Sequence, residues 1–141
     1  MPFLLDTMAI SEFRKPLPNA GFLGWASANE GEETFLASPT LGELVQGAFQ
    51  ARPAERRRVL ASWIAQTEER FAERIIPFGI EAARVWGEAN SVARRSGRRL
   101  SPIDSQLAAI AVVHGLTIVT RNVRDFKIPE FKALRVVNPW S

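Results

Sequence analysis

The stretch Leu116-Thr117-Ile118-Val119-Thr120 predicts a strand that is buried on both faces, because it is apolar or β-branched throughout and carries no charge. Four other short runs resemble it: Phe3-Leu4-Leu5, Thr34-Phe35-Leu36-Ala37, Arg74-Ile75-Ile76-Pro77-Phe78 and Arg135-Val136-Val137-Asn138-Pro139. Continuous apolar strands of this kind are typical of a parallel sheet that helices cover on both faces.

Segments with helical patterning separate these strands. We expect helices at 8–14, at 19–28, after Ser38-Pro39, after Pro53, at 80–94 and after Ser101-Pro102, with Gly115 ending the last one. The alternation predicts an α/β fold with three α/β/α layers around a parallel sheet of about four to five short strands. No repeat or change of composition divides the chain, so we expect residues 1–141 to form a single domain.

The composition excludes several kinds of chemistry. There is no cysteine and only one histidine, His114, which excludes disulfides, thiol nucleophiles, thiolate zinc sites and multi-histidine metal sites. Neither a G-x-S-x-G nor a G-x-x-x-x-G-K-[ST] motif occurs. Any reaction must therefore use carboxylates, hydroxyls, amides and arginines.

Charge and hydropathy indicate the surroundings of the protein. The 18 Lys plus Arg exceed the 15 Asp plus Glu by only three, yet the pI is about 10.2 because most of the cations are arginine. This excess suits a phosphate-bearing partner. No apolar run is long enough to cross a membrane, and the N-terminal apolar run reaches Asp6 too soon for a signal peptide. We therefore expect a cytoplasmic protein.

Four acidic residues fall where an open parallel sheet places its ligand site, outside the carboxyl ends of the strands. Asp6 follows the first strand, Glu43 lies in the first turns of the helix after the second strand, and Asp125 follows Thr120 closely. Asp104 joins them if its helix packs back toward the same edge. A cluster of carboxylates repels itself unless a cation neutralises it, and Mg²⁺ prefers oxygen ligands. The pattern therefore favours a metal site that activates water for phosphodiester cleavage.

Each acid also has a purely structural interpretation. Asp6 with Thr7 can begin a turn. The other three acids match or resemble helix caps: Thr40-x-x-Glu43, Ser101-x-x-Asp104 and Asn122-x-x-Asp125. The same two interpretations apply to the polar neighbours Thr7, Thr120 and Asn122. They can orient a metal-bound water or touch a phosphate oxygen, or they can be turn and cap residues with no role in the site.

Basic residues gather near two of the acids. The loop Arg94-Arg95-Ser96-Gly97-Arg98-Arg99 immediately precedes the helix of Asp104, and Arg121 and Arg124 flank Asp125. Of these residues Arg98, Arg99 and Arg121 are candidate contacts for an RNA backbone, which would provide affinity without sequence information. The alternative is a solvated, mobile loop.

Several motifs together resemble the PIN-domain ribonucleases, and within them the VapC-type toxins of bacterial toxin–antitoxin pairs. The resemblance covers nearly the whole chain. It rests on Phe3-Leu4-Leu5-Asp6-Thr7, Ser38-Pro39-Thr40-Leu41-Gly42-Glu43-Leu44, Ser101-Pro102-Ile103-Asp104-Ser105-Gln106-Leu107-Ala108-Ala109, the run from Leu116 to Phe126, and Asn138-Pro139-Trp140.

The resemblance implies an α/β/α fold, RNA cleavage that depends on Mg²⁺ or Mn²⁺, a cognate antitoxin and a homodimer. Asp6, Glu43 and Asp104 match the metal-binding acids of the family, and Asp125 matches its more variable fourth acid. Asn122 stands where many relatives have another Asp, so either residue, or both through water, can complete the site. Met8 stands where relatives usually have Asn.

Two other classes of function compete with this hypothesis. Met8 and Asn122 motivate a catalytically inert PIN-like module that binds RNA or protein. A phosphoacceptor receiver domain has a similar sheet, but it needs a lysine after a late strand, and Lys15, Lys127 and Lys132 do not stand there. We therefore retain the nuclease and the inert module as hypotheses.

Overall fold

Five short parallel strands form the centre of the molecule in the computed structural model, which describes all 141 residues. In sheet order they are β3 (Ile75–Ile76), β2 (Thr34–Ala37), β1 (Phe3–Leu5), β4 (Thr117–Val119) and β5 (Arg135–Val137). Every neighbouring pair is parallel, and Leu4 of β1 lies opposite Phe35 on one side and Ile118 on the other. The predicted parallel sheet is confirmed.

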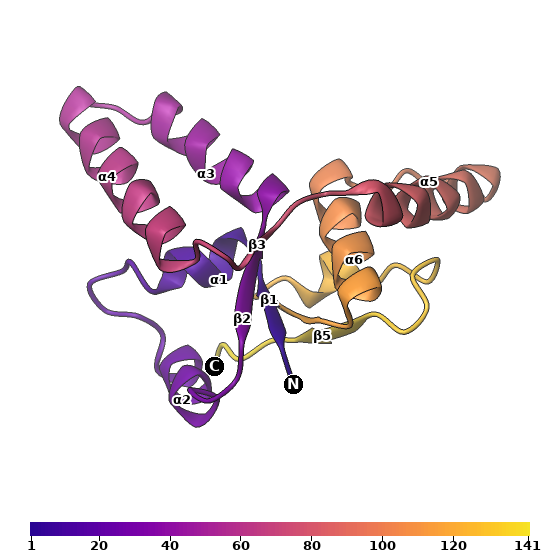
Figure 1. Ribbon diagram of the computed structural model, residues 1–141, viewed down its shortest axis with the longest axis horizontal. Helices are drawn as coiled ribbons and strands as arrows, with labels where there is room; N and C mark the ends of the chain where they lie inside the picture. The colour runs from indigo at the N-terminus through magenta and orange to yellow at the C-terminus, as the bar shows by residue number, and fades with distance from the viewer.

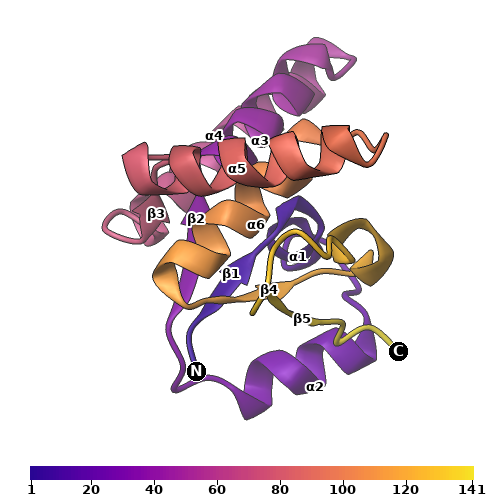
Figure 2. The same cartoon turned by 90° about the vertical axis from the view of Figure 1, so that its right-hand side faces the viewer.

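Helices cover both faces of this sheet and complete a three-layer α/β/α fold (Figure 1). On one face lie α1 (Thr7–Glu12), α2 (Ala20–Ala28), α3 (Ser38–Gln50) and α4 (Ala54–Arg70). On the other lie α5 (Ile80–Arg95) and α6 (Pro102–His114). Figure 2 shows α6 passing between α5 and the strands. No helix is both long and apolar enough to cross a membrane.

The apolar core is divided in two by the sheet, as strands buried on both faces require. Leu4 and Ile118 point into the cluster shared with α5 and α6. Phe3, Leu5 and Val119 point into the cluster shared with α1 to α4. The side chains of Leu4, Leu5, Ile118 and Val119 are at most 1% exposed, so the ends of β1 and β4 are fixed by packing on both sides.

Several elements differ from their predicted bounds; β4 and β5, for example, end at Val119 and Val137 rather than at Thr120 and Pro139. The first helix ends at Glu12, earlier than residue 14, and it begins at Thr7 because the Asp6 carboxylate caps it. The third strand is reduced from residues 74–78 to Ile75–Ile76, and Pro77, which has no N–H to give to a ladder, directly follows it. The predicted helix stop at Gly115 is confirmed, since this residue has φ 65° and ends α6 in the left-handed conformation.

Candidate functional site

The carboxyl ends of β1 and β4 bring the first polar groups together. Leu5 pairs with Val119, and the Asp6 backbone N–H donates to the Val119 carbonyl at 3.2 Å. The residues that directly follow the two strands are Asp6 and Thr120, and both are buried. The central pair of strands therefore fixes a carboxylate and a hydroxyl at one edge of the sheet.

A pocket of about 120 Å³ opens at this edge. Asp6 and Thr7 reach it from the β1–α1 junction, and other lining residues come from α3, α6 and the turn after β4. The complete lining is Asp6, Thr7, Met8, Glu43, Asp104, Leu107, Thr120, Asn122, Asp125 and Phe126. We call it the acidic pocket. It contains all four predicted acids together with the predicted polar neighbours.

Hydrogen bonds orient two of the acids. Asp6 Oδ1 accepts from the backbone N–H of Ala9 at 2.8 Å, so this carboxylate caps α1 while it lines the pocket. Glu43 Oε1 accepts from the Thr7 hydroxyl at 2.5 Å, which joins α3 to the first residue of α1. The Thr7 hydroxyl is therefore engaged in orienting the Glu43 carboxylate.

The cap interpretation is wrong for Glu43 and holds in part for Asp104 and Asp125. Helix α3 begins with Ala37 as its N-cap and has no side-chain cap, and Thr40 is fully buried inside the helix with its Oγ1 unpartnered. Neither Ser101 nor Asn122 makes a side-chain cap hydrogen bond at the start of its helix. Asp104 and Asp125 do lie in the first turns of α6 and η1, where the helix dipole favours an acid. This placement does not explain why both meet Glu43 and Asp6 in one pocket.

Burial and mutual repulsion perturb two of the carboxyl groups. Burial raises the pKa of Asp6 above its ordinary value, against hydrogen bonds from Thr120 and the backbone, and the charge of Glu43 adds to the rise. Burial also raises the pKa of Asp104, and the nearby charges of Asp125, Glu43 and Asp6 act in the same direction. The ionised pocket is therefore an electrostatically unfavourable cluster that a cation would relieve.

The donor set fits a hard divalent cation in its chemistry. It offers carboxylate, hydroxyl and amide oxygens and no nitrogen or thiolate ligand. No group of three or more acidic or histidine side chains is arranged, as the side chains stand, to hold an ion. Mg²⁺ does not require such a group, because it is usually bound by one or two carboxylates and keeps several waters.

The turn after β4 supplies the remaining wall of the pocket. The Thr120 hydroxyl accepts from the backbone N–H of Asn122 at 3.0 Å, and the Asn122 carbonyl accepts from the N–H of Asp125 at 3.0 Å. The Asn122 amide donates to the sulfur of Met8 at 3.1 Å. Met8 therefore contacts Asn122, a pocket residue at the other end of the chain.

The predicted basic residues lie outside the acidic pocket. Arg98 forms an ion pair with Glu130, whose side chain is only 6% exposed, and this pair ties the basic loop to the segment before β5. Arg99 and Arg121 are exposed. Of these three cations, Arg121 lies beside the pocket, because it directly precedes Asn122.

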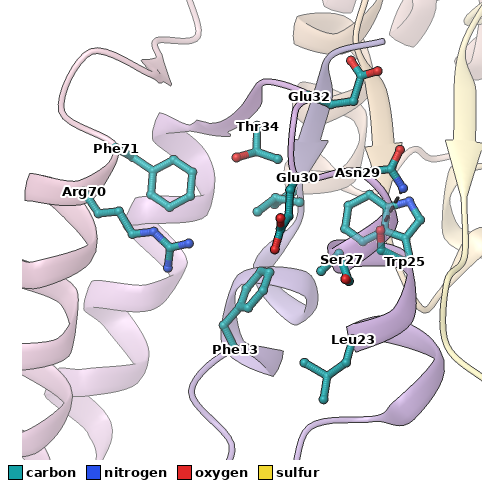
Figure 3. A pocket seen from close by; sticks show the side chains of 12 residues that line it. Phe13, Leu23, Trp25, Ser27, Asn29, Glu30, Glu32, Thr34, Arg70 and Phe71 are labelled. Carbon is teal, nitrogen blue, oxygen red and sulfur yellow. Dashed lines mark hydrogen bonds between the residues drawn. The ribbon is translucent and has the colours of Figure 1, made fainter.

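A second hollow, of about 410 Å³, lies between α1, α2 and α4 on another part of the surface (Figure 3). Phe13, Trp25 and Phe71 provide much of its apolar wall, and Arg70 stands over the rings of Phe13 and Phe71 at 5.7 and 5.5 Å. It shares no residue with the acidic pocket. The two features are therefore separate sites of the molecule.

Three members of the acidic pocket were not among the predicted site residues. Met8, Leu107 and Phe126 give it a partly apolar wall. Leu107 lies three residues after Asp104 on α6, a spacing that places both on one side of a helix and could have identified it. The hydrogen bond between Met8 and Asn122 has no signal in the sequence, because 114 residues separate them.

Comparisons with known proteins agree with this fold. The model of the PIN domain family matches residues 3–132. The chain is 34% identical to the VapC ribonuclease Y4jK of Sinorhizobium fredii, over 98% of this chain and 97% of that protein. It is 32% identical to toxin FitB of Neisseria gonorrhoeae, covering 97% of both. The crystal structure of FitAcB from Neisseria gonorrhoeae superposes with a TM-score of 0.84, at 32% identity and 99% coverage of both chains. This chain therefore belongs to the PIN domain family.

Proposed function

We propose that this protein is a metal-dependent endoribonuclease, and that it acts as the toxin of a toxin–antitoxin pair. The observation that carries the proposal is the meeting of Asp6, Glu43, Asp104 and Asp125 in one pocket, in a chain that has no cysteine and whose only histidine lies elsewhere. The similarity to a VapC ribonuclease and to a toxin supports the reaction class and the biological role.

The acids have distinct roles in this proposal. Asp6 and Asp104, the two acids with raised pKa values, are the principal metal ligands, and Glu43 and Asp125 bind directly or through water. Asn122 completes the ligand set through its amide oxygen or by orienting a water. Thr7 keeps the Glu43 carboxylate in place, and the buried Thr120 supports the turn that carries Asn122. Arg99 and Arg121 approach the RNA backbone from outside the pocket.

When bound, Mg²⁺ or Mn²⁺ supplies an activated water and stabilises charge on the phosphate and the leaving oxygen. The chain must position that chemistry with its own groups. Burial of Asp6 and the packing of β1 and β4 hold this ligand rigidly, which is what an accurately placed ligand set requires. The exposed side of the pocket, with Asn122 and Asp125, is where RNA approaches.

The proposal includes partners and a location. A cognate antitoxin is the expected inhibitor, and RNA of the cytoplasm is the expected substrate. A homodimer is supported by large apolar side chains left on the outer surfaces of α3 and α5, where Phe49 is 81% and Val92 is 45% exposed. In this proposal residues 1–141 act as one domain.

One observation favours a second candidate function. The Asn122 amide donates to Met8 instead of to a polar side chain, so an amide at the edge of the pocket is held by a weak acceptor. A pocket that orients its ligands loosely suits an inert PIN-like module that binds RNA or protein without cleaving it. Such a module binds RNA equally well with EDTA and leaves it intact.

The test is cleavage of end-labelled structured RNA, including a tRNA pool, by purified antitoxin-free protein. Reactions contain Mg²⁺, Mn²⁺ or EDTA, and the wild type is compared with Asp6→Asn, Asp104→Asn and the control Glu88→Gln, an exposed acid on α5. We expect defined cuts that need metal, persist in the control and vanish in both pocket variants. Cleavage by Asp104→Asn at the wild-type rate refutes the assignment, and RNA that is bound but uncut in every reaction favours the inert module.

A further inference from the structure

A basic hollow of about 600 Å³ adjoins the acidic pocket on the solvent side of the turn after β4. This turn, η1 (Val123–Phe126), and its flanking residues provide the entire lining: Arg121, Asn122, Val123, Arg124, Asp125 and Lys127. We call it the η1 hollow. Asn122 and Asp125 line both this hollow and the acidic pocket, so the two adjoin each other at this turn. In Figure 2 the turn is the golden segment beside α1.

The three cations of the η1 hollow are available for a ligand. Arg121, Arg124 and Lys127 are exposed, whereas the ion pairs of the structure engage the N-terminus, Lys15 and Arg98. Their backbone groups, by contrast, are held: the Arg121 carbonyl accepts from the Asn138 amide at 3.3 Å, and the Arg124 carbonyl accepts from the Lys127 N–H at 3.2 Å. The turn therefore has a backbone held by hydrogen bonds and three cationic side chains that form no ion pair.

The position of these charges solves an electrostatic problem of the proposed reaction. A phosphodiester that approaches four carboxylates is repelled, and the repulsion is strong where the acids are partly buried. Cations beside the point of entry offset it and retain the polyanion without reading its sequence. Arg98 of the basic loop is already engaged by Glu130, which leaves the η1 cations as the unpaired charges that share a turn with a pocket acid.

We propose that Arg121, Arg124 and Lys127 form a phosphate-binding track that holds the backbone of single-stranded RNA next to its scissile phosphate. This inference rests on the proposed nuclease function and adds Arg124 and Lys127 to the substrate-binding residues. The track acts on the phosphates that flank the reacting one, so its residues are positioning residues. Their loss weakens RNA binding while the acidic pocket stays intact.

The test measures binding of a short fluorescein-labelled single-stranded RNA of mixed sequence by fluorescence anisotropy, in EDTA, over a series of KCl concentrations. EDTA stops metal-dependent cleavage, and non-specific binding does not require the natural target. The test variant is Arg121→Gln/Arg124→Gln/Lys127→Gln. The control, Arg52→Gln/Arg56→Gln/Arg58→Gln, removes the same charge from exposed positions at the α3–α4 tip, far from η1 (Figure 1).

Each phosphate contact contributes about 0.7 to the slope of log Kd against log salt for a single strand, so the test variant should lose about 2 from this slope. The control variant should keep the slope of the wild type. Circular dichroism and thermal melting of both variants verify the fold. An unchanged slope and Kd in the folded test variant, or an equal loss in both variants, overturns the proposal.

Metal-dependent cleavage separates this proposal from the nuclease assignment. With Mg²⁺, the test variant should cleave with a raised KM and a nearly unchanged kcat, because the acids remain. If the wild type cleaves and the test variant matches it in KM, the track is refuted and the nuclease stands. If the wild type cuts no RNA in any metal but the slope still falls by about 2, the nuclease assignment fails and the track remains as a binding surface.

Discussion

Replacing Asp6 separates its structural role from its charge. The Asp6 carboxylate caps α1 through the Ala9 N–H, and it also belongs to a repulsive cluster that raises its pKa. Asn caps helices about as well as Asp does, whereas Ala cannot cap. Asp6→Ala should therefore lose the cap, and Asp6→Asn should lose only the charge.

The expected magnitudes follow from these two contacts. Loss of an N-cap costs about 1 kcal/mol, and a buried N–H left without a partner costs about 1–3 kcal/mol, so we expect Asp6→Ala to be about 1–2 kcal/mol less stable than Asp6→Asn, which also lacks the charge. For a chain of this size that is a difference in Tm of about 3–7 °C. Asp6→Asn should be as stable as the wild type or more stable at pH 7 without metal, because the buried charge is gone.

The pH dependence has a definite sign. Burial raises the pKa of Asp6 in the folded state above its ordinary value of 3.8, so ionisation is easier in the unfolded chain. As the pH rises past 3.8, the wild type loses stability relative to Asp6→Asn until the Asp6 carboxyl also ionises in the folded state. Above that pH the difference in unfolding free energy between the two proteins is constant. Below 3.8 both states hold the proton and this cost disappears.

Urea unfolding followed by circular dichroism in EDTA, at pH 7 and at acidic pH, provides the measurement. The wild type, Asp6→Asn and Asp6→Ala are compared under identical conditions. The reasoning fails if Asp6→Asn is destabilised as much as Asp6→Ala at pH 7, since the carboxylate would then stabilise the fold through its charge.

Three further predictions concern the scaffold. Arg98→Ala leaves the nearly buried Glu130 carboxylate unpaired, so equilibrium unfolding should show a loss of about 1–3 kcal/mol of unfolding free energy. The control Arg99→Ala, at an exposed position, should change the unfolding free energy by about 0.5 kcal/mol or less. Gly115→Ala puts a Cβ at φ 65° and should lower stability by about 1–2 kcal/mol in the same assay, and equal stability would show that α6 tolerates another ending. Phe22→Ala removes a fully buried ring packed on Phe13 and should cost about 3–5 kcal/mol, seen as a large fall in Tm.

The layout of the fold could be predicted from the sequence because its strands are buried on both faces. Thr117–Val119 and Phe3–Leu5 carry no polar alternation, and this pattern alone indicates a parallel sheet between helices. Strand order then placed Asp6 and Thr120 side by side through the pairing of β1 with β4. The sequence could place Asp104 at this edge only on the condition that its helix packs back toward it. In the structure α6 does so, and Asp104 lines the acidic pocket.

The individual contacts of the site could not be predicted, because they depend on tertiary packing. Thr40-x-x-Glu43 has the spacing of a capping box, but the N-cap of α3 is Ala37, three residues before Thr40, and the Glu43 carboxylate accepts from Thr7 instead. The cap interpretation fitted Asp6 least in the sequence, yet Asp6 is the acid that caps a helix. Local spacing cannot show which of two available partners a side chain will choose.

Binding of Mn²⁺ tests most directly whether the four carboxylates form one cation site, because it does not depend on knowing the RNA target. The electron paramagnetic resonance signal of free Mn²⁺ is followed during titration of the wild type, Asp104→Asn and the exposed control Glu88→Gln at pH 7. The wild type and Glu88→Gln should deplete the signal equally, and Asp104→Asn should deplete it clearly less. Equal depletion by all three proteins would contradict the account.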